Sequence, residues 1–343
     1  MISPLTLKEI RGFLERSHNP LFLFDDDNDG LCSFLLLREF IGRGDGLQIK
    51  TNPDLNESFL KVIKKYDADT IFVLDKPLVS QDFIDGVNVP IVWIDHHEPV
   101  FMNGVKYYNP KLDGSEDHSS TTYWCYKAVG GKVWVAAVGA VSDWTLPDYF
   151  TQFKQEYPDL VNNEIKPDAV LYETALGRLC KIFSLLNKGS HKEVQNSIDL
   201  LLKIKTPYEI LNEESSYGKD LMKKVRKPEK KYNELVDKAM KTKKDGPLLL
   251  FCYIADDTSF TSDLSNELLY RNPRSFIIVA REKEGKLVMS LRSDIFEVLP
   301  ILKKALGRIN GGYGGGHMKA CGAGVPKEEF DIFLNVIKNE INL

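Results

Sequence analysis

The 343-residue sequence has no long apolar run and little net charge, and each absence excludes a class of protein. Without a run of about 18 apolar residues, no membrane span is expected. The N-terminus also lacks the basic, then apolar, then small-residue order of a secretory signal. Since the formal net charge is −4, any nucleic acid must be bound by a local patch and not by a generally basic surface.

Cysteine is also scarce, and its spacing excludes further classes. The five cysteines are scattered and never form a Cys-x-x-Cys pair, so zinc ligation and a disulfide framework are not expected. They favour reduced, mostly buried thiols in a cytoplasmic protein. A composition of 43% hydrophobic and 27% charged residues is typical of a globular protein, and the length suggests about two domains.

Short apolar runs that end in aspartate fill the first part of the chain. Strands are expected over Pro20–Asp25, Thr70–Asp75 and Val89–Asp95, because each run is too short for a helix and continuously apolar, as in parallel strands buried on both faces. A helix is expected over Ser33–Gly44, and Lys132–Asp143 could be helix or strand. Ligands bind beyond the carboxyl ends of parallel strands, so we expect a site at this edge.

The chain is predicted to be an α/β protein in three parts: a parallel-sheet domain over 1–160, a helical connector over 161–245 and a smaller α/β domain over 246–343. In the last part, strands are expected over Leu248–Ala255, Ser275–Glu282 and Lys286–Ser293, followed by a glycine-rich loop over Gly311–Gly324 and a final amphipathic helix. The lysine-rich segment Lys219–Lys244 is either a solvated helix or a track for a nucleic-acid backbone.

The first strand runs into an acidic cluster that contains Asp25, Asp27 and Asp29, followed by Gly30. Carboxylates this close repel one another, and a bound divalent cation removes the repulsion. The alternatives are a solvated acidic turn and a calcium loop. A calcium loop also needs a glutamate six residues after the glycine, and that stretch here is apolar.

Other acids and two histidines also lie at the ends of apolar segments. Asp75 ends the second strand, Asp95-His96-His97 ends the third, and Asp143 ends the fourth apolar segment. An adjacent pair of histidines is weak evidence alone, but imidazole beside carboxylate suits manganese or zinc. Neighbouring strand ends can bring these groups together, and two cations that share a carboxylate can activate water and bind a phosphoryl oxygen.

Taken together, these motifs resemble the DHH family of phosphoesterases, which includes RecJ-type exonucleases and oligoribonuclease-like enzymes. Asp75 matches the second motif, although Lys76-Pro77 replaces the usual small polar pair, and Ser119–Thr122 resembles the helix start before the fourth. The other motifs match Asp25, Asp27, Asp29, Gly30 and Ser33 (first), Asp95, His96 and His97 (third), and Asp143 (fourth). The G-G-G-H run of the associated DHHA1 domain matches Gly314, Gly315, Gly316 and His317.

The resemblance implies two divalent cations that Asp75 bridges. Mn²⁺ is the expected ion, and Mg²⁺ is the alternative. It assigns Asp27 and Asp75 to one cation, with Asp25 assisting. The other cation takes Asp29, Asp75, His96 and Asp143. Some relatives have a histidine at the position of Leu23, so the first cation has one ligand fewer here. His97 is expected to face the phosphate or to orient a ligand, and Asp95 to hydrogen-bond a histidine.

The resemblance also implies a substrate-binding role for the C-terminal part. Arg292 and Ser293 match a pair that contacts substrate phosphate, a task that suits the planar fork of arginine. Gly314, Gly315 and Gly316 let a phosphate approach backbone N–H groups, and His317 adds a donor. Asn266 is expected either to contact a base or sugar or to cap a helix.

The predicted function is a metal-dependent phosphodiesterase that hydrolyses single-stranded DNA or RNA, or short oligonucleotides, from an end. The residues expected to carry catalysis are Asp29, Asp75, His96, His97 and Asp143. Two alternatives stay open. One is a phosphatase or phosphodiesterase acting on 3′,5′-bisphosphate nucleotides or cyclic dinucleotides, and the other is a catalytically silent scaffold in a replication complex.

Overall fold

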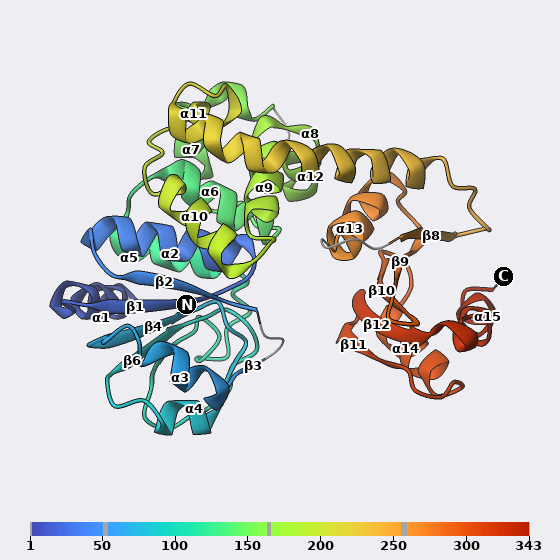
Figure 1. Cartoon of the computed structure of the whole chain (residues 1–343), viewed down its shortest axis with the longest axis horizontal. Helices are drawn as coiled ribbons and strands as arrows, with labels where there is room; N and C mark the ends of the chain where they lie inside the picture. Colours follow the sequence, from blue (N-terminus) through green and yellow to red (C-terminus); the bar gives the residue numbers. More distant parts are fainter. Residues whose placement is uncertain (1, 51–53, 163–165, 255–258, 343) are drawn as a thin grey trace. The chain divides into compact units, whose positions relative to one another are not determined.

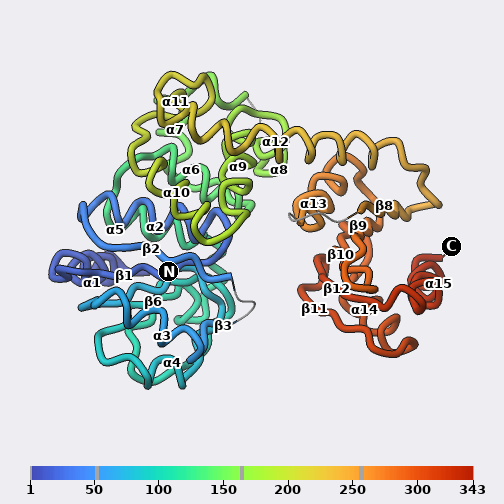
Figure 2. The backbone as a smooth tube through the Cα atoms, in the orientation of Figure 1, coloured from blue at the N-terminus to red at the C-terminus, as the bar shows by residue number. Residues whose placement is uncertain are grey.

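The computed structural model, shown in Figure 1 and Figure 2, describes residues 2–50, 54–162, 166–254 and 259–342. The chain divides into two compact units, Met1–Val225 and Arg226–Leu343, and the boundary lies inside one long helix, α12 (Ser216–Met240). This boundary falls within the segment that the sequence analysis assigns to a helical connector. In the described part of the chain, no helix is both long enough and apolar enough to span a membrane.

The first unit is built on a parallel sheet with the strand order β2-β1-β4-β6-β7. Its three inner strands confirm the three predicted from the sequence, while the two edge strands are additional. A small parallel pair, β3 (Asp54–Leu55) with β5 (Leu78–Val79), lies outside it. The strands of the main sheet are β1 (Pro20–Asp25), β2 (Asp45–Ile49), β4 (Thr70–Leu74), β6 (Ile91–Ile94) and β7 (Lys106–Tyr108).

Helices make up the rest of the first unit, together with two short 3-10 turns, Glu57–Phe59 and Pro158–Leu160. From residue 166 onward the unit is entirely helical in its described secondary structure, as predicted for this part of the chain; residues 163–165 lie outside the described residues. The helices are α1 (Pro4–Arg16), α2 (Asn28–Ile41), α3 (Leu60–Ile63), α4 (Gln81–Asp85), α5 (Thr121–Val129), α6 (Val133–Ser142), α7 (Phe150–Glu156), α8 (Pro167–Glu173), α9 (Ala175–Leu186), α10 (His191–Leu201) and α11 (Tyr208–Leu211).

The central strands are buried on both faces, as their continuous apolar runs predict. Alternate side chains point to opposite sides of a strand. Phe22 and Phe24 therefore share one face, where both rings contact Phe34 of α2 with centroids 5.5 and 4.9 Å away. Leu21 and Leu23 share the other face, in a core to which α3 and α4 also contribute. Figure 1 shows α2 and α5 on one side of the sheet and α3 and α4 on the other.

Helix α2 begins at Asn28, earlier than the predicted Ser33, so the acidic cluster lies partly within a helix. Asp27 is the N-cap, and its carboxylate accepts a 2.9 Å hydrogen bond from the backbone N–H of Gly30. Such a cap stabilises a helix by about 1 kcal/mol. Only glycine fits at position 30, because a Cβ there would lie 2.7 Å from the backbone N and O of Asp25. The helix start therefore packs directly against the end of β1.

The segment Lys132–Asp143, for which the sequence left helix or strand open, forms helix α6. It is buried along nearly its whole length against α2, α5 and α9. Small residues permit this packing: a Cβ at Gly139 would lie 2.3 Å from Oγ1 of Thr122 in α5. The close approach of α5 and α6 brings Asp143, which follows α6, into the neighbourhood of the α5 N-terminus.

The second unit contains a sheet with the order β11-β12-β10-β9-β8, in which β8 and β9 are parallel and the other pairs antiparallel. The three predicted strands are confirmed, although Ala255 lies outside the described residues. Helices α14 and α15 pack on its core. The elements are β8 (Leu248–Ile254), α13 (Thr261–Arg271), β9 (Phe276–Lys283), β10 (Lys286–Ser293), α14 (Val298–Leu306), β11 (Tyr313–His317), β12 (Ala320–Pro326), the 3-10 turn Lys327–Glu329 and α15 (Phe330–Glu340).

The prediction of a glycine-rich loop over Gly311–Gly324 is wrong. Most of this segment forms the antiparallel hairpin β11–β12, in which Gly314 pairs with Ala323 and His317 with Ala320. Glycine is depleted in strands, so the sequence favours a loop. Neighbouring backbone explains two of these glycines, because a Cβ would lie 2.8 Å from the carbonyl oxygen of Gly322 at Gly314 and 2.5 Å from that of Ala320 at Gly316.

Candidate metal centre

In the first sheet, β2 lies on one side of β1, and β4, β6 and β7 follow on the other side. The strand order therefore reverses between β1 and β4, and α/β sheets bind ligands at such a switch point. Asp25 ends β1 and Asp75 directly follows β4, so the two acids lie at the mouth of this switch point. His96 follows the next strand, β6. The predicted site residues of the first unit therefore come from neighbouring strand ends and from the helices that start or end beside them.

His96 is the group around which the acids gather. Its Nε2 lies 3.4 Å from Oδ1 of Asp75 and 3.8 Å from Oδ2 of Asp29, and its Nδ1 lies 3.7 Å from Oδ2 of Asp143. Two sets of ligand-type atoms lie within 4.8 Å of one another: Asp75 with His96 and His97, and Asp29 with His96 and Asp143. The residues that the family resemblance assigns to the second cation thus come together in space.

The N-terminus of helix α5 holds two of these acids. The backbone N–H groups of Thr121 and Thr122 donate to the two carboxylate oxygens of Asp29, at 2.8 and 2.7 Å. The Thr121 hydroxyl donates to Oδ1 of Asp75 at 3.0 Å. A helix N-terminus stabilises negative charge, and its first N–H groups have no partners within the helix. This is the physical role of the serine- and threonine-rich helix start noted in the sequence.

Hydrogen bonds from Asn28 tie the start of α2 to the end of α6. Its Nδ2 donates to Oγ of Ser142 and to the carbonyl of Cys180, both at 2.8 Å. Asp29 and Asp143 directly follow Asn28 and Ser142 in the chain. The hydrogen bond between Asn28 and Ser142 therefore holds the two acids on adjoining elements. The sequence could not show this, because Asn28 and Ser142 are 114 residues apart.

Asp95 contacts His97 and not His96. The Nδ1 atom of His97 lies 2.7 Å from Oδ1 of Asp95, whose Oδ2 accepts hydrogen bonds from Tyr107 Oη and Asn109 Nδ2, each at 3.2 Å. Asp95 is fully buried. This network orients the His97 ring, as carboxylate partners of histidine commonly do. Tyr107 and Asn109 belong to the network but were not singled out in the sequence, where no motif marks them.

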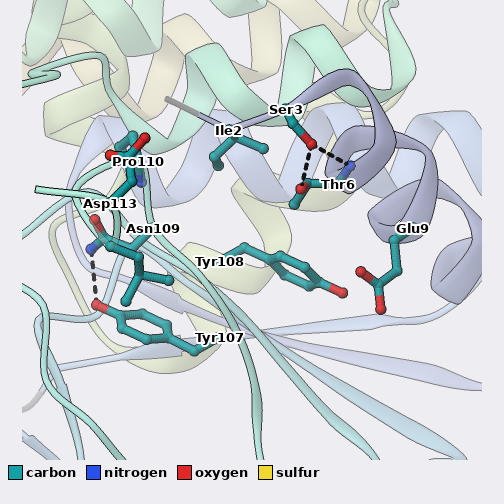
Figure 3. Close-up of a pocket in the computed structure, with 10 residues that line it drawn as sticks. Ile2, Ser3, Thr6, Glu9, Tyr107, Tyr108, Asn109, Pro110 and Asp113 are labelled. Carbon is teal, nitrogen blue, oxygen red and sulfur yellow. Dashed lines mark hydrogen bonds between the residues drawn. The ribbon is translucent and has the colours of Figure 1, made fainter. Parts of the chain in front are cut away.

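Tyr107 and Asn109 also line a pocket of about 310 Å³ beside the start of α1 (Figure 3). Figure 3 shows the 2.8 Å hydrogen bond between Asn109 and the Tyr107 hydroxyl at one side of this pocket. Its lining includes none of the candidate metal ligands. Its lining is Ile2, Ser3, Thr6, Glu9, Tyr107, Tyr108, Asn109, Pro110, Leu112 and Asp113.

The electrostatics of the cluster favour a bound cation. Burial, together with repulsion from Asp29 and Asp27, raises the pKa of both Asp75 and Asp143 well above the usual value for aspartate. Burial lowers the pKa of His96, which therefore carries a free ring nitrogen for ligation. Burial also opposes the charge on His97, but the hydrogen bond and negative charge of Asp95 outweigh it and raise the pKa of His97.

Asp25 forms a salt bridge with a buried lysine, Lys76. The ammonium of Lys76 lies 2.6 Å from Oδ1 of Asp25, and the lysine side chain is only 2% exposed. Burial and repulsion from Asp27 raise the pKa of Asp25 to about 6, although Lys76 lowers it in part. The sequence marked Lys76 only as a departure from the family pattern and gave no sign of its partner.

The residues around His96 fit a divalent cation. They supply carboxylate oxygens and imidazole nitrogen, a donor set that Mn²⁺ accepts, and their ligand atoms already lie within 4.8 Å of one another. Mutual repulsion among buried carboxylates is what such an ion would relieve. On the Asp25 side the fit is poorer, because Lys76 occupies an oxygen of Asp25 and the buried Leu23 offers no ligand atom.

In the second unit, Arg292 is held in place by neighbours. Its Nε donates to Oδ1 of Asn266 at 2.6 Å, and an Nη donates to Oγ of Ser262 at 3.0 Å. Asn266 lies inside α13, where its side chain contacts Arg292 of β10, so it does not cap the helix. Ser293 is buried, and its hydroxyl donates to the carbonyl of Ser275 at 2.8 Å. The substrate-binding role of these residues stays a prediction.

The glycine run of the second unit is open to solvent. Gly314, Gly315, Gly316 and His317 are all exposed in strand β11. Gly316 has φ 141°, a conformation that favours glycine. The run thus offers exposed backbone in a hairpin, in place of the loop expected from the sequence.

Comparison with known proteins agrees with this architecture. Residues 250–343 match the family model of the DHHA1 domain, while a search of curated proteins finds no significant match. The chain is similar to RecJ of Thermus thermophilus, solved with Mn²⁺, at a TM-score of 0.69 and 15% identity. This match covers 99% of the chain and 55% of that protein, so the chain spans about half the length of that RecJ.

Two further solved structures are similar over nearly their whole length. An exonuclease RecJ bound to manganese gives a TM-score of 0.66 at 14% identity, covering 97% of this chain and 94% of that one. A pGpG-specific phosphodiesterase, PggH of Vibrio cholerae, gives 0.54 at 15% identity, covering 94% of this chain and 99% of that one. The chain therefore has the RecJ-like fold of the DHH-family phosphoesterases, with a DHHA1 domain at residues 250–343.

Proposed function

We propose that the chain is a metal-dependent phosphoesterase that hydrolyses phosphodiester bonds of single-stranded nucleic acid or short oligonucleotides from an end. One observation carries the proposal: Asp29, Asp75 and Asp143 gather around the His96 ring at a sheet switch point. Asp29 and Asp75 are buried and accept hydrogen bonds from the start of α5, an arrangement that has little structural purpose without a cation. The gathering accordingly argues against a catalytically silent scaffold.

The chemistry divides between the cation and the chain. The resemblance implies two Mn²⁺ or Mg²⁺ ions; a bound cation lowers the pKa of its water and neutralises charge on the phosphoryl oxygens. Burial lowers the pKa of His96 and so favours the neutral ring, which would hold the cation through a ring nitrogen. Asp95 orients the neighbouring His97 and favours its protonated form, which would donate a hydrogen bond to a phosphate oxygen or a proton to the leaving oxygen.

Arg292 and His317 are proposed to bind substrate phosphate through the second unit. The guanidinium of Arg292 is oriented by Asn266 and Ser262 before any ligand arrives, which lowers the entropy lost on binding. His317 lies on exposed backbone in β11. Ser293 is assigned a supporting part here, because its buried hydroxyl accepts hydrogen bonds from the N–H groups of Ile295 and Phe296 and thereby shapes the chain after Arg292.

The substrate class is supported by the names of the similar proteins, an exonuclease and a pGpG-specific phosphodiesterase. Both descriptions concern phosphodiesters of nucleotides, one in polymers and one in a dinucleotide. We favour single-stranded DNA or RNA and short oligonucleotides as partners, with the cytoplasm as compartment. Cleavage restricted to dinucleotides or bisphosphate nucleotides is the alternative outcome of the test below.

The test is to incubate end-labelled oligonucleotides of several lengths, from a dinucleotide upward, with the full chain and Mn²⁺, and to resolve the products. A ladder that shortens from one end, and disappears with a chelator, is expected. Asp75→Ala should abolish it, whereas Asp85→Asn, an exposed acid of α4, should not. Absence of hydrolysis of every nucleotide substrate by a folded, Mn²⁺-loaded chain would overturn the proposal.

A further inference from the structure

Lys76 places an ammonium group beside the acidic cluster. It immediately follows Asp75, its side chain is 2% exposed, and its Nζ lies 2.6 Å from the Asp25 carboxylate. The backbone of Lys76 is also fixed, because its carbonyl accepts a 2.9 Å hydrogen bond from the indole N–H of Trp93 in β6. A buried ammonium persists only when paired, so this contact is a built feature of the site and not a mobile surface ion pair.

The remaining groups on this side of the cluster offer fewer atoms at metal-ligand spacing than the groups around His96. One carboxylate oxygen of Asp25 is engaged by Lys76, and one of Asp27 accepts the N-cap hydrogen bond from Gly30. Leu23 is fully buried and has no ligand atom. Among the described residues, the clusters with metal-ligand spacing include neither Asp25 nor Asp27, and both contain His96.

We propose that the chain binds a single divalent cation, on the His96 side of the cluster, and that the ammonium of Lys76 takes the place of a second cation on the Asp25 side. This inference rests on the proposed function for its metal-dependent chemistry. It departs from the pair of cations that the resemblance implies. An ammonium carries a single positive charge, whereas the cation carries two. It also offers three N–H donors, whereas the cation offers open coordination positions.

The substitution changes what this side of the site can do. An ammonium cannot activate a bound water as a divalent ion does, but it compensates the charge of the carboxylate that it contacts. Its charge also opposes entry of a cation beside Asp25, since like charges at short range in a buried site repel strongly. Lys76 is thus assigned to charge compensation on the Asp25 side, while a cation held by His96 and its neighbouring acids would supply an activated water.

The experiment counts ions and does not depend on turnover. The full chain is saturated with Mn²⁺ and dialysed, and bound metal is measured by elemental mass spectrometry. Electron paramagnetic resonance then separates an isolated ion from an exchange-coupled, carboxylate-bridged pair. We expect one isolated Mn²⁺ per wild-type chain, a second coupled ion in Lys76→Ser, and one ion in Lys64→Ser, which removes an exposed lysine.

Asp25→Asn keeps the inference testable if Lys76→Ser does not fold. With one ion near His96, Asp25→Asn leaves both the Mn²⁺ count and the spectrum unchanged; with a pair, it weakens or removes one ion. Two coupled ions in the wild type, loss of metal in Asp25→Asn, or a single ion in folded Lys76→Ser would each overturn the inference. Each of those outcomes is compatible with the proposed hydrolytic function. A wild type that binds no ion and cleaves no substrate would overturn the proposed function as well.

Discussion

The carboxyl edge of the first sheet and the glycine-rich hairpin of the second unit contrast in how they hold functional side chains. At the sheet edge, charged groups are buried and held by partners from several elements, as with Asp29 against the α5 N-terminus. In the hairpin, the glycines and His317 are exposed. Buried charge suits a group that must bind a metal in fixed geometry, while exposed backbone suits a surface that a substrate can reach. The predictions below test this division.

The largest effect is expected at His96, which both candidate ligand sets share. His96→Ala should remove most bound Mn²⁺ and lower kcat by at least about 10²-fold, the loss typical of a single stabilising group in an active site. Metal content and turnover measured on the same sample check this. His191→Ala, an exposed histidine at the start of α10, is the matched control. Full metal content in His96→Ala would show that the ion binds elsewhere.

A smaller effect, confined to substrate binding, is expected in the second unit. Arg292→Lys keeps the charge but loses the fork held by Asn266 and Ser262, so KM should rise about tenfold with metal content unchanged. His317→Ala should act in the same direction. Steady-state kinetics beside metal analysis separates the two regions, with the exposed Arg308→Lys as control. If His317→Ala instead lost its metal, the proposed division between the units would fail.

The pH dependence of stability should also distinguish the sheet edge. In the metal-free protein the pKa of Asp25 is raised from 3.8 to about 6, and the pKa values of Asp75 and Asp143 also lie well above the usual value for aspartate. These groups bind more protons in the folded than in the unfolded chain within that window. The free energy of unfolding therefore falls as pH rises from about 4 through 6 and beyond. His97, with its raised pKa, acts in the same direction, and His96 opposes it.

Thermal unfolding in chelator across that pH range measures this effect. Since 1 kcal/mol shifts Tm by about 2–4 °C in a unit of this size, a fall of several degrees is expected. Asp75→Asn should flatten the dependence and raise Tm near neutral pH, because it removes one repelling charge. Mn²⁺ should abolish the fall in the wild type. A Tm that rises with pH in chelator would contradict the assignment of raised pKa values.

The smallest effect concerns helix α12 and its lysines. The helix has buried apolar residues on one side and exposed charges on the other, which favours a solvated helix over a nucleic-acid track. In Asp75→Ala, a dinucleotide and a long single strand should therefore show similar, shallow salt dependence. Each phosphate contacted on a single strand would add about −0.7 to the slope of log K against log salt. A much steeper slope for the long strand would reverse this preference.

Much of the first unit could be predicted because its signals are local. The continuous apolar runs of β1, β4 and β6 each end at the acid or histidine motif that the site uses, and a parallel sheet brings such ends to one edge. The edge strands β2 and β7 were missed because they are short or carry polar residues. Helix α2 was predicted too short because its first turn is acidic and contains glycine, a composition typical of turns.

The contacts that decide the chemistry were beyond sequence reasoning, because they join residues far apart in the chain. Lys76 and Asp25 are 51 positions apart, and Arg292 and Asn266 are 26 apart. No periodicity connects either pair. A lysine after a strand is ordinarily a solvated side chain, and only the fold shows that this one is buried against a carboxylate. The hairpin β11–β12 was missed for a similar reason, because backbone pairing determines it and not side-chain pattern.

The backbone of Asp75 has φ 61°, and this left-handed conformation limits which residues evolution can place at the end of β4. Glycine, asparagine and aspartate adopt it with least strain. The substitutions that best preserve the fold are therefore those that most damage the site, since asparagine loses the charge and glycine the ligand. Either change needs only a single nucleotide substitution in an aspartate codon. One such substitution would therefore remove a candidate metal ligand and leave the fold of this strand end intact.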